Sequence, residues 1–115
     1  MSILGSAERL AAALAHLGLT IDQRAETGDV DSSWTAKLLS KGVGACADKA
    51  EEEAGEFIQA LRGESDDRVA SEAADMLYHA FVALRVRGVS LNDVAVALEK
   101  RQGTSGIAEK ASRKG

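Results

Sequence analysis

Two acidic pairs are the residues of this sequence best suited to chemistry. Glu53 and Glu56 are three positions apart, and Glu72 and Asp75 repeat that spacing nineteen residues after Glu53. Carboxylates that are brought together repel one another, and their pKa values rise unless a cation neutralises them. Carboxylate oxygens are hard ligands, so we expect Mg²⁺ here, with Mn²⁺ as the alternative. An ion of this kind can neutralise a polyphosphate and activate a water molecule for attack on phosphorus.

A plainer interpretation of the same residues is a solvated acidic face that nearby basic side chains balance. The balancing charges would be Lys49, Arg62 and Arg68, and charged pairs at this spacing are common on helices. The spacing alone leaves the two interpretations open. A zinc site is disfavoured because the chain has one cysteine and two separated histidines.

The composition favours one small helical domain. The chain has 115 residues, of which 45% are hydrophobic and only 3% are aromatic, and it contains no proline. An alanine-rich sequence with few aromatic residues suits closely packed helices better than sheets. A chain this short buries a modest share of its surface, so we expect it to associate into an oligomer.

The charge and the cysteine count limit the partners and the compartment. The net charge is −4, which argues against general nucleic-acid binding because such binding needs a basic surface. Cys46 is the only cysteine, so no intrachain disulfide can form and the reducing cytoplasm is the expected location. We expect Cys46 to be a small packed residue. The first residues lack the pattern of a signal peptide, and no segment is apolar over the roughly 18 residues of a membrane span.

Capping residues and apolar periodicity predict five helices. The ranges expected for them are about 7–17, 34–42, 44–62, 66–87 and 91–101. Residues 19–32 lack a helical period and are predicted to form a loop. Ser33, Ser65 and Ser90 are the expected N-caps. Gly18 is the expected end of the first helix.

The third and fourth predicted helices must position the acidic pairs. Because a short link joins them, these helices should pack in antiparallel directions and bring the acids together. The apolar stripe of the third helix, which we expect to be buried, consists of Ala54, Phe57, Ile58 and Leu61. On a helical wheel the acids form a band beside this stripe. The sequence therefore predicts a metal site that borders the apolar core.

Four segments, taken together, resemble a known family. "SWTAKLLSKG", "KAEEEAGE", "EAADMLYH" and "GVSLNDVAVALEKRQGTSGIAEKASRKG" follow one another in this order. They resemble phosphoribosyl-ATP pyrophosphohydrolase of histidine biosynthesis over residues 33–115. That family belongs to the all-α NTP pyrophosphatases, which include MazG and the dimeric dUTPases. The resemblance implies an all-α bundle of about four or five helices of the MazG-like type, forming a homodimer or a higher homo-oligomer.

The resemblance also implies an activity and a set of ligands. The reaction is hydrolysis of phosphoribosyl-ATP to phosphoribosyl-AMP and pyrophosphate. The ExxE and ExxD motifs of the family fall on the residues that would bind Mg²⁺, which are Glu53, Glu56, Glu72 and Asp75. Glu52 would support the site, so that the expected catalytic residues are Glu52, Glu53 and Glu56. Either Glu52 or Glu56 would accept a proton from the attacking water.

Basic residues are the candidates for contacts with substrate phosphates. They are Lys37, Lys41, Lys49, Lys100, Arg101, Lys110 and Arg113. Lysines at helix ends also serve simply to complement the helix dipole. Trp34 can stack on an adenine or fix a helix start, and His79 can approach the metal or pack between helices; packing is the commoner use of both. Two positions depart from the family pattern, because Glu51 replaces a glycine and Gln102 replaces a histidine.

The whole chain, residues 1–115, is predicted to be a single domain. Its parts are an N-terminal helix and loop at 1–32, core helices at 33–101 and a basic tail at 102–115. The resemblance suggests a transient contact with phosphoribosyl-AMP cyclohydrolase. Two other functions stay open. One is a house-cleaning pyrophosphatase for non-standard nucleotides, and the other is a non-catalytic helical interaction module.

Overall fold

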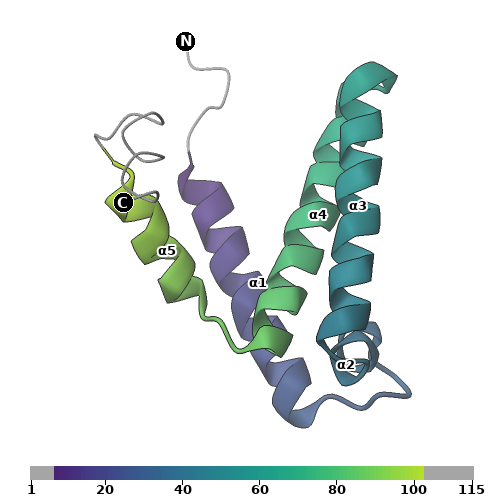
Figure 1. The fold of residues 1–115 in the computed structure, drawn as a ribbon, viewed down its shortest axis with the longest axis vertical. Coiled ribbons are helices and arrows are strands. Elements are labelled where there is room, and N and C mark those ends of the chain that lie inside the picture. Colours follow the sequence, from purple (N-terminus) through teal and green to yellow (C-terminus); the bar gives the residue numbers. More distant parts are fainter. Residues whose placement is uncertain (1–6, 103–115) are drawn as a thin grey trace, which may run out of the picture.

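The described part of the protein folds into five α-helices, as the sequence predicted. The computed structural model describes residues 7–102, and none of these residues is in a β-strand. The helices are α1 (Glu8–Thr27), α2 (Trp34–Ser40), α3 (Val43–Gly63), α4 (Asp66–Arg87) and α5 (Leu91–Lys100) (Figure 1). Within that range, no helix combines the length and the apolar character that crossing a membrane requires.

The first helix is much longer than the sequence predicted. α1 continues well beyond Gly18, so the predicted loop at 19–32 is wrong for residues 19–27. A Cβ atom at Gly18 would lie 2.8 Å from Leu91 Cδ1 at the start of α5. The glycine therefore allows two helices to approach each other, and the buried Ile21 anchors the second half of α1. Tertiary packing here outweighs the weak helix propensity of glycine.

The predicted serine caps are confirmed for α2, α4 and α5. The side chains of Ser33, Ser65 and Ser90 each accept a hydrogen bond from a backbone N–H in the first turn of their helix. Asp93 completes a capping box with Ser90. Gly88 ends α4 with a φ of 83°, a left-handed conformation that favours glycine. These local signals fix where α4 begins and ends, and α4 carries half of the predicted acidic site.

A small core joins the first four helices. Ile21, Leu38, Cys46 and Val82 are buried and pack together, one from each of α1 to α4. The Cys46 thiol donates a hydrogen bond to the Leu38 carbonyl oxygen at 3.3 Å, and burial raises the pKa of this thiol. Cys46 is therefore the small packed residue that the sequence predicted.

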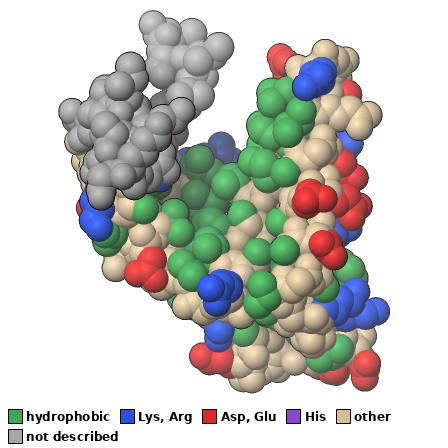
Figure 2. Space-filling view, in the orientation of Figure 1, with side chains coloured by type: hydrophobic (Ala, Val, Ile, Leu, Met, Phe, Trp, Pro, Cys, Tyr) green, Lys and Arg blue, Asp and Glu red, His purple; other side chains and the backbone are tan. Residues whose placement is uncertain are grey.

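The helices form two arms. α3 and α4 make an antiparallel hairpin, and α1 lies with α5 in the other arm (Figure 1). A hollow of about 390 Å³ lies between α1, the end of α4 and the start of α5, with Phe81 and Leu84 in its wall. Figure 2 shows hydrophobic side chains in the opening between the arms and along the inner side of the α3–α4 hairpin. The arms therefore present apolar surface to each other.

The apolar stripe of α3 is not buried within the chain, contrary to the prediction. Ile58 is 48% exposed and Leu61 is 57% exposed, whereas Ala54 and Phe57 are partly buried. The helical wheel identifies an apolar side of a helix, but it does not show whether the same chain covers that side. α5 also has no buried residue. Exposed apolar surface on both arms is typical of a protein that associates with a partner.

Gly28, where α1 gives way to the loop before α2, should not tolerate a side chain. A Cβ there would lie 2.4 Å from the Arg24 carbonyl oxygen and 2.8 Å from Ala36 Cβ. We expect Gly28→Ala to lower the free energy of unfolding by about 1–3 kcal/mol, a typical cost of overpacking. Urea unfolding measures the change. Gly44→Ala is the matched control because a Cβ at Gly44 meets nothing within 4 Å; equal stability of the two variants would contradict the tight contact.

Candidate metal centre

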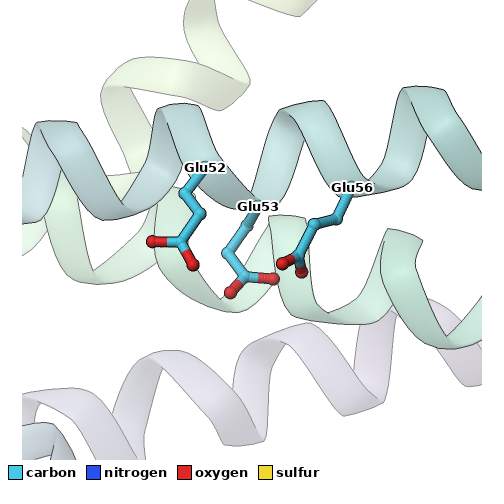
Figure 3. A group of neighbouring side chains, drawn as sticks. All are labelled: Glu52, Glu53 and Glu56. Atoms are coloured by element: carbon cyan, nitrogen blue, oxygen red, sulfur yellow. The ribbon is translucent and has the colours of Figure 1, made fainter.

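The α3–α4 hairpin brings the predicted acidic residues together. One carboxylate oxygen from each of Glu53, Glu72 and Asp75 lies within 4.8 Å of the others, and the same holds for Glu52, Glu53 and Glu56. Figure 3 shows Glu52, Glu53 and Glu56 extending from the same side of α3. Glu53 belongs to both groups, so the five residues form one continuous acidic cluster. Their position agrees with the prediction, and their metal-binding role stays a prediction.

Glu53 and Glu72 lie inside the contact between α3 and α4, and not beside it. These residues are only 7% and 5% exposed. On α3, the buried residues Cys46, Glu53 and Ala60 recur every seven positions, which places them on one side of the helix. The predicted place of the acids beside a buried apolar stripe is therefore wrong for Glu53 and Glu72, whereas Glu52, Glu56 and Asp75 are exposed. Cys46 and Ala60, seven residues before and after Glu53, are small, so α4 can approach α3 along this side. Glu53 therefore lies in the contact, and the larger apolar side chains of α3 lie beside the contact.

Two basic side chains approach the acids of α3. Lys49 Nζ lies 3.4 Å from Glu52 Oε1 and 3.7 Å from Glu53 Oε1. His79 Nε2, from α4, lies 3.9 Å from Glu53 Oε1. Burial lowers the pKa of His79, and the charge of Lys49 acts in the same direction. Both effects favour the neutral form of the imidazole.

On α4, the basic partner of Glu72 is Arg68. Its Nη2 donates a hydrogen bond to Glu72 Oε1, and its Nε donates one to Glu64 Oε1 at 3.3 Å. The sequence-based prediction treats Arg68 only as a balancing charge, although its spacing of four residues from both Glu64 and Glu72 indicates this bridge. The other oxygen of Glu72, Oε2, is buried and has no hydrogen-bond partner. A buried oxygen of this kind costs free energy of folding unless something binds it.

The acidic cluster fits a hard divalent cation. Its donors are all carboxylate oxygens, which are the ligands that Mg²⁺ and Mn²⁺ prefer. Glu72 Oε2 supplies an oxygen that no described protein group uses as a partner. A hollow of about 190 Å³, lined by Glu56 and Glu72 among others, adjoins the acids. The acidic cluster therefore has the ligand type that a hard divalent ion needs, and a hollow beside two of its residues.

The acidic cluster also changes the titration of Glu56. The negative charge of Glu53 raises the pKa of the Glu56 carboxyl above its ordinary value of 4.5, and burial and a hydrogen bond to Glu53 act in the same direction. A carboxyl whose pKa is raised by folding favours the folded state at pH values below its unfolded pKa. That contribution is lost as the pH rises through the folded value.

We therefore expect Glu56→Gln to stabilise the metal-free protein at neutral pH. In EDTA, the Tm of this variant should exceed that of the wild type at pH 7, and the difference should shrink towards pH 4, where Glu56 is protonated. Thermal unfolding followed by circular dichroism at several pH values measures this. The control is Glu51→Gln, the same change of charge at an exposed neighbour outside the acidic cluster. Identical Tm values for the two variants at pH 7 would argue against repulsion at Glu56.

Four of the predicted substrate-binding residues lie on elements other than the α3–α4 hairpin that carries the acidic cluster. Lys37 is on α2 and Lys41 follows it, whereas Lys100 and Arg101 lie at the end of α5, in the other arm (Figure 1). Two further candidates, Lys110 and Arg113, lie outside the described residues. Of the predicted phosphate contacts, Lys49 is the one that the described structure pairs with the acidic cluster.

The two aromatic candidates are placed differently. His79 is buried with its ring edge-on to that of Tyr78, at 4.8 Å between centroids, and its Nε2 also faces Glu53 at 3.9 Å, so both predicted places of His79 stay open. Trp34 is half exposed and has Lys41 Nζ at 5.4 Å from its ring centroid, so it does not fix the start of α2 by burial. The hydroxyls of Thr35 and Tyr78 hydrogen-bond to each other. This link between α2 and α4 has no clear signal in the sequence.

The fold and the acidic cluster together define a class of protein. An all-α fold whose hairpin joins an ExxE motif on one helix to an ExxD motif on the next is the arrangement that the sequence resemblance implied for the all-α NTP pyrophosphatases. In this chain the two motifs are on α3 and α4, and Glu53 connects them.

Comparison with known proteins identifies the family within this class. Residues 14–102 match the family described as phosphoribosyl-ATP pyrophosphohydrolase. The chain is 55% identical over 101 residues to the phosphoribosyl-ATP pyrophosphatase of Cereibacter sphaeroides strain KD131. These 101 residues cover 87% of this chain and 96% of the relative. Proteins of the same name from Dinoroseobacter shibae and Ruegeria pomeroyi are 54% and 52% identical over 101 residues, covering 87% of this chain and 97% and 94% of the relatives. The chain therefore belongs to the phosphoribosyl-ATP pyrophosphohydrolase family, as the sequence resemblance predicted.

Proposed function

We propose that this protein hydrolyses phosphoribosyl-ATP to phosphoribosyl-AMP and pyrophosphate with the help of Mg²⁺, or Mn²⁺, bound by the acidic cluster. Membership of the family and the shared name of the relatives support the reaction, a step of histidine biosynthesis. The observation that carries the proposed site is Glu72 Oε2, which is buried without a hydrogen-bond partner. Glu72 lies in the same group of oxygens as Glu53 and Asp75.

Four acids of the cluster would hold the ion, and Lys49 would offset part of their charge. The ion would be held by Glu53, Glu56, Glu72 and Asp75. When bound, Mg²⁺ neutralises phosphate oxygens and lowers the pKa of a water molecule. Glu53 would connect the two groups of ligands, because its carboxylate belongs to both. Lys49 would offset part of the negative charge, since its ammonium group lies beside Glu52 and Glu53.

Glu56 is the better of the two candidates for the proton acceptor. The ammonium group of Lys49 lies within ion-pair distance of Glu52 and Glu53 and not of Glu56, so the Glu56 carboxylate is the freer of the two to accept a proton. Glu52, in contrast, is paired with Lys49 at 3.4 Å. In the proposed reaction a water molecule attacks phosphorus and its proton passes to Glu56. The bond between the α- and β-phosphates breaks, and pyrophosphate leaves.

A homodimer is part of the proposal. The exposed side chains of Ile58 and Leu61 on α3, together with the apolar inner surface of the arms (Figure 2), support a contact with a second copy. Lys100 and Arg101 end the arm opposite the acidic cluster, so a second copy offers them a route to substrate phosphates. A cytoplasmic location, a single domain over the whole chain and a transient contact with phosphoribosyl-AMP cyclohydrolase stay predictions.

Pyrophosphate release from phosphoribosyl-ATP tests the proposed function. The purified chain should release pyrophosphate with Mg²⁺, stop in EDTA and recover with added Mn²⁺. A panel of non-standard nucleoside triphosphates, assayed in parallel, serves as the competing set of substrates. Faster release from that panel would favour the house-cleaning pyrophosphatase. Absence of release from every substrate, together with absence of Mn²⁺ binding, would favour the non-catalytic interaction module.

A further inference from the structure

We propose that Arg68 is a positioning residue for the metal site: it holds one oxygen of Glu72 and thereby leaves the other oriented for the ion. This inference rests on the proposed function, because it needs Glu72 to be a ligand. Arg68 would act through Glu72 and would not itself contact the ion. Its basis is the geometry of a short chain of contacts from Glu64 through Arg68 to Glu72.

Two contacts fix the direction of the Arg68 guanidinium. Nη2 donates to Glu72 Oε1, and Nε donates to Glu64 Oε1 at 3.3 Å. Glu64 follows the last residue of α3, and Glu72 lies within α4, so the guanidinium links the turn of the hairpin to the acidic cluster. A planar guanidinium held through two of its nitrogens has a defined orientation, which a single contact does not impose.

The burial of Glu72 makes this orientation matter. The side chain of Glu72 is 6% exposed, and that of Arg68 is 58% exposed. The terminal torsion of a glutamate is broad, so a free carboxylate samples many orientations. Arg68 fixes Oε1, and Oε2 is then the buried atom without a partner. A ligand that is already oriented loses less conformational freedom when the ion binds, which is how hydrogen-bonded partners of metal ligands raise metal affinity.

Lys49 makes a different kind of contact on the α3 side of the acidic cluster. Its ammonium group is 3.4 Å and 3.5 Å from the two oxygens of Glu52 and 3.7 Å from Glu53 Oε1. An ammonium group is a compact point charge without a plane, so these contacts do not impose an orientation on either carboxylate. Lys49 therefore contributes charge, whereas Arg68 contributes charge and direction.

A positioning role for Arg68 and simple electrostatics predict opposite effects of removing Arg68 on cation affinity. If Arg68 served only as a balancing charge, its removal would leave the acidic cluster more negative and would strengthen cation binding. If Arg68 positions Glu72, its removal should weaken cation binding, because losing the hydrogen-bonded partner of a metal ligand typically costs about 10- to 100-fold in affinity.

Calorimetric titration of the full chain with Mn²⁺, without nucleotide, tests this directly. We expect Arg68→Met to raise the Kd for Mn²⁺ by at least about tenfold. Arg68→Lys keeps the charge but loses the two-nitrogen hold, so its Kd should fall between those of the wild type and Arg68→Met. Arg62→Met is the matched control, because it removes the same charge from an exposed arginine in the last turn of α3. Its Kd should stay at the wild-type value or decrease slightly.

An Arg68→Met protein that binds Mn²⁺ as tightly as the wild type, or more tightly, would overturn the proposal. Circular dichroism establishes that the variants fold. If Arg68→Met does not fold, Arg68→Lys decides, and an unchanged Kd in that variant rejects the role. Glu72→Gln separates this inference from the function on which it rests. Wild-type Mn²⁺ binding by Glu72→Gln would reject the metal site itself, whereas its loss alongside intact binding by Arg68→Met would reject only the role of Arg68.

Discussion

Glu53→Gln is expected to lower the turnover of phosphoribosyl-ATP by at least about a hundredfold. Glu53 contributes an oxygen to both groups of the acidic cluster, so the substitution removes a ligand from each. Loss of a partner that only supports a ligand costs about 10- to 100-fold, and loss of a shared ligand should cost at least the upper value. Steady-state rates of pyrophosphate release at saturating Mg²⁺ measure the effect, and Mn²⁺ titration should show weaker binding in the same variant.

The control for this experiment is on the same helix. Glu51→Gln makes the same change of charge at an exposed residue outside the acidic cluster, and its turnover should stay within about threefold of the wild type, as expected of a surface substitution. Glu53→Gln should still fold, because it removes a negative charge from a crowded site. Turnover by Glu53→Gln close to that of Glu51→Gln would reject the assignment of the acidic cluster as the active site.

Ile58→Asp is expected to separate the proposed dimer into monomers. Ile58 is a large apolar side chain that the chain leaves 48% exposed, and a partner that covers it would have to bury the new carboxylate without a compensating charge. A residue central to such a contact contributes at least about 2 kcal/mol, so the dimer Kd should rise about 30-fold or more. Sedimentation equilibrium over a range of protein concentrations measures this change.

Val30→Asp is the matched control for the dimer. Val30 is 46% exposed and lies in the loop between α1 and α2, so it resembles Ile58 in exposure but is outside α3. Its dimer Kd should equal that of the wild type. A wild-type protein that sediments as a monomer at high concentration, or equal behaviour of the two variants, would show that the apolar side of α3 is not the contact.

The parts of the fold that depend on neighbouring residues could be predicted from the sequence. Ser33, Ser65 and Ser90 are N-caps because a serine oxygen reaches an N–H group within its own first turn. Gly18 was wrongly predicted to end the first helix, because a glycine can either end a helix or leave room for a neighbouring helix. The choice depends on Leu91, which is far away in the sequence and close in space. No periodicity in residues 19–27 reports that contact.

The acidic cluster was predictable in its members but not in its surroundings. The repeated spacing of the acids placed them on two adjoining helices, and the short link implied that these helices pack together. The wheel assigned the larger apolar side chains to the core, whereas the buried residues of α3 are Cys46, Glu53 and Ala60. The exposure of Ile58 depends on which helix surfaces pack against each other, and the periodicity of a single helix does not specify that packing.

If the acidic cluster binds a cation as proposed, charged acids within a helix contact would tie the lifetime of the protein to its cation supply. A native state that binds an ion gains stability as the free ion concentration rises above the Kd. Without the ion, Lys49 and Arg68 offset only part of the negative charge of Glu53 and Glu72 in this buried seam, so the hairpin should open more often. Proteases act on such opened forms. Magnesium starvation would then reduce the amount of the protein as well as its rate.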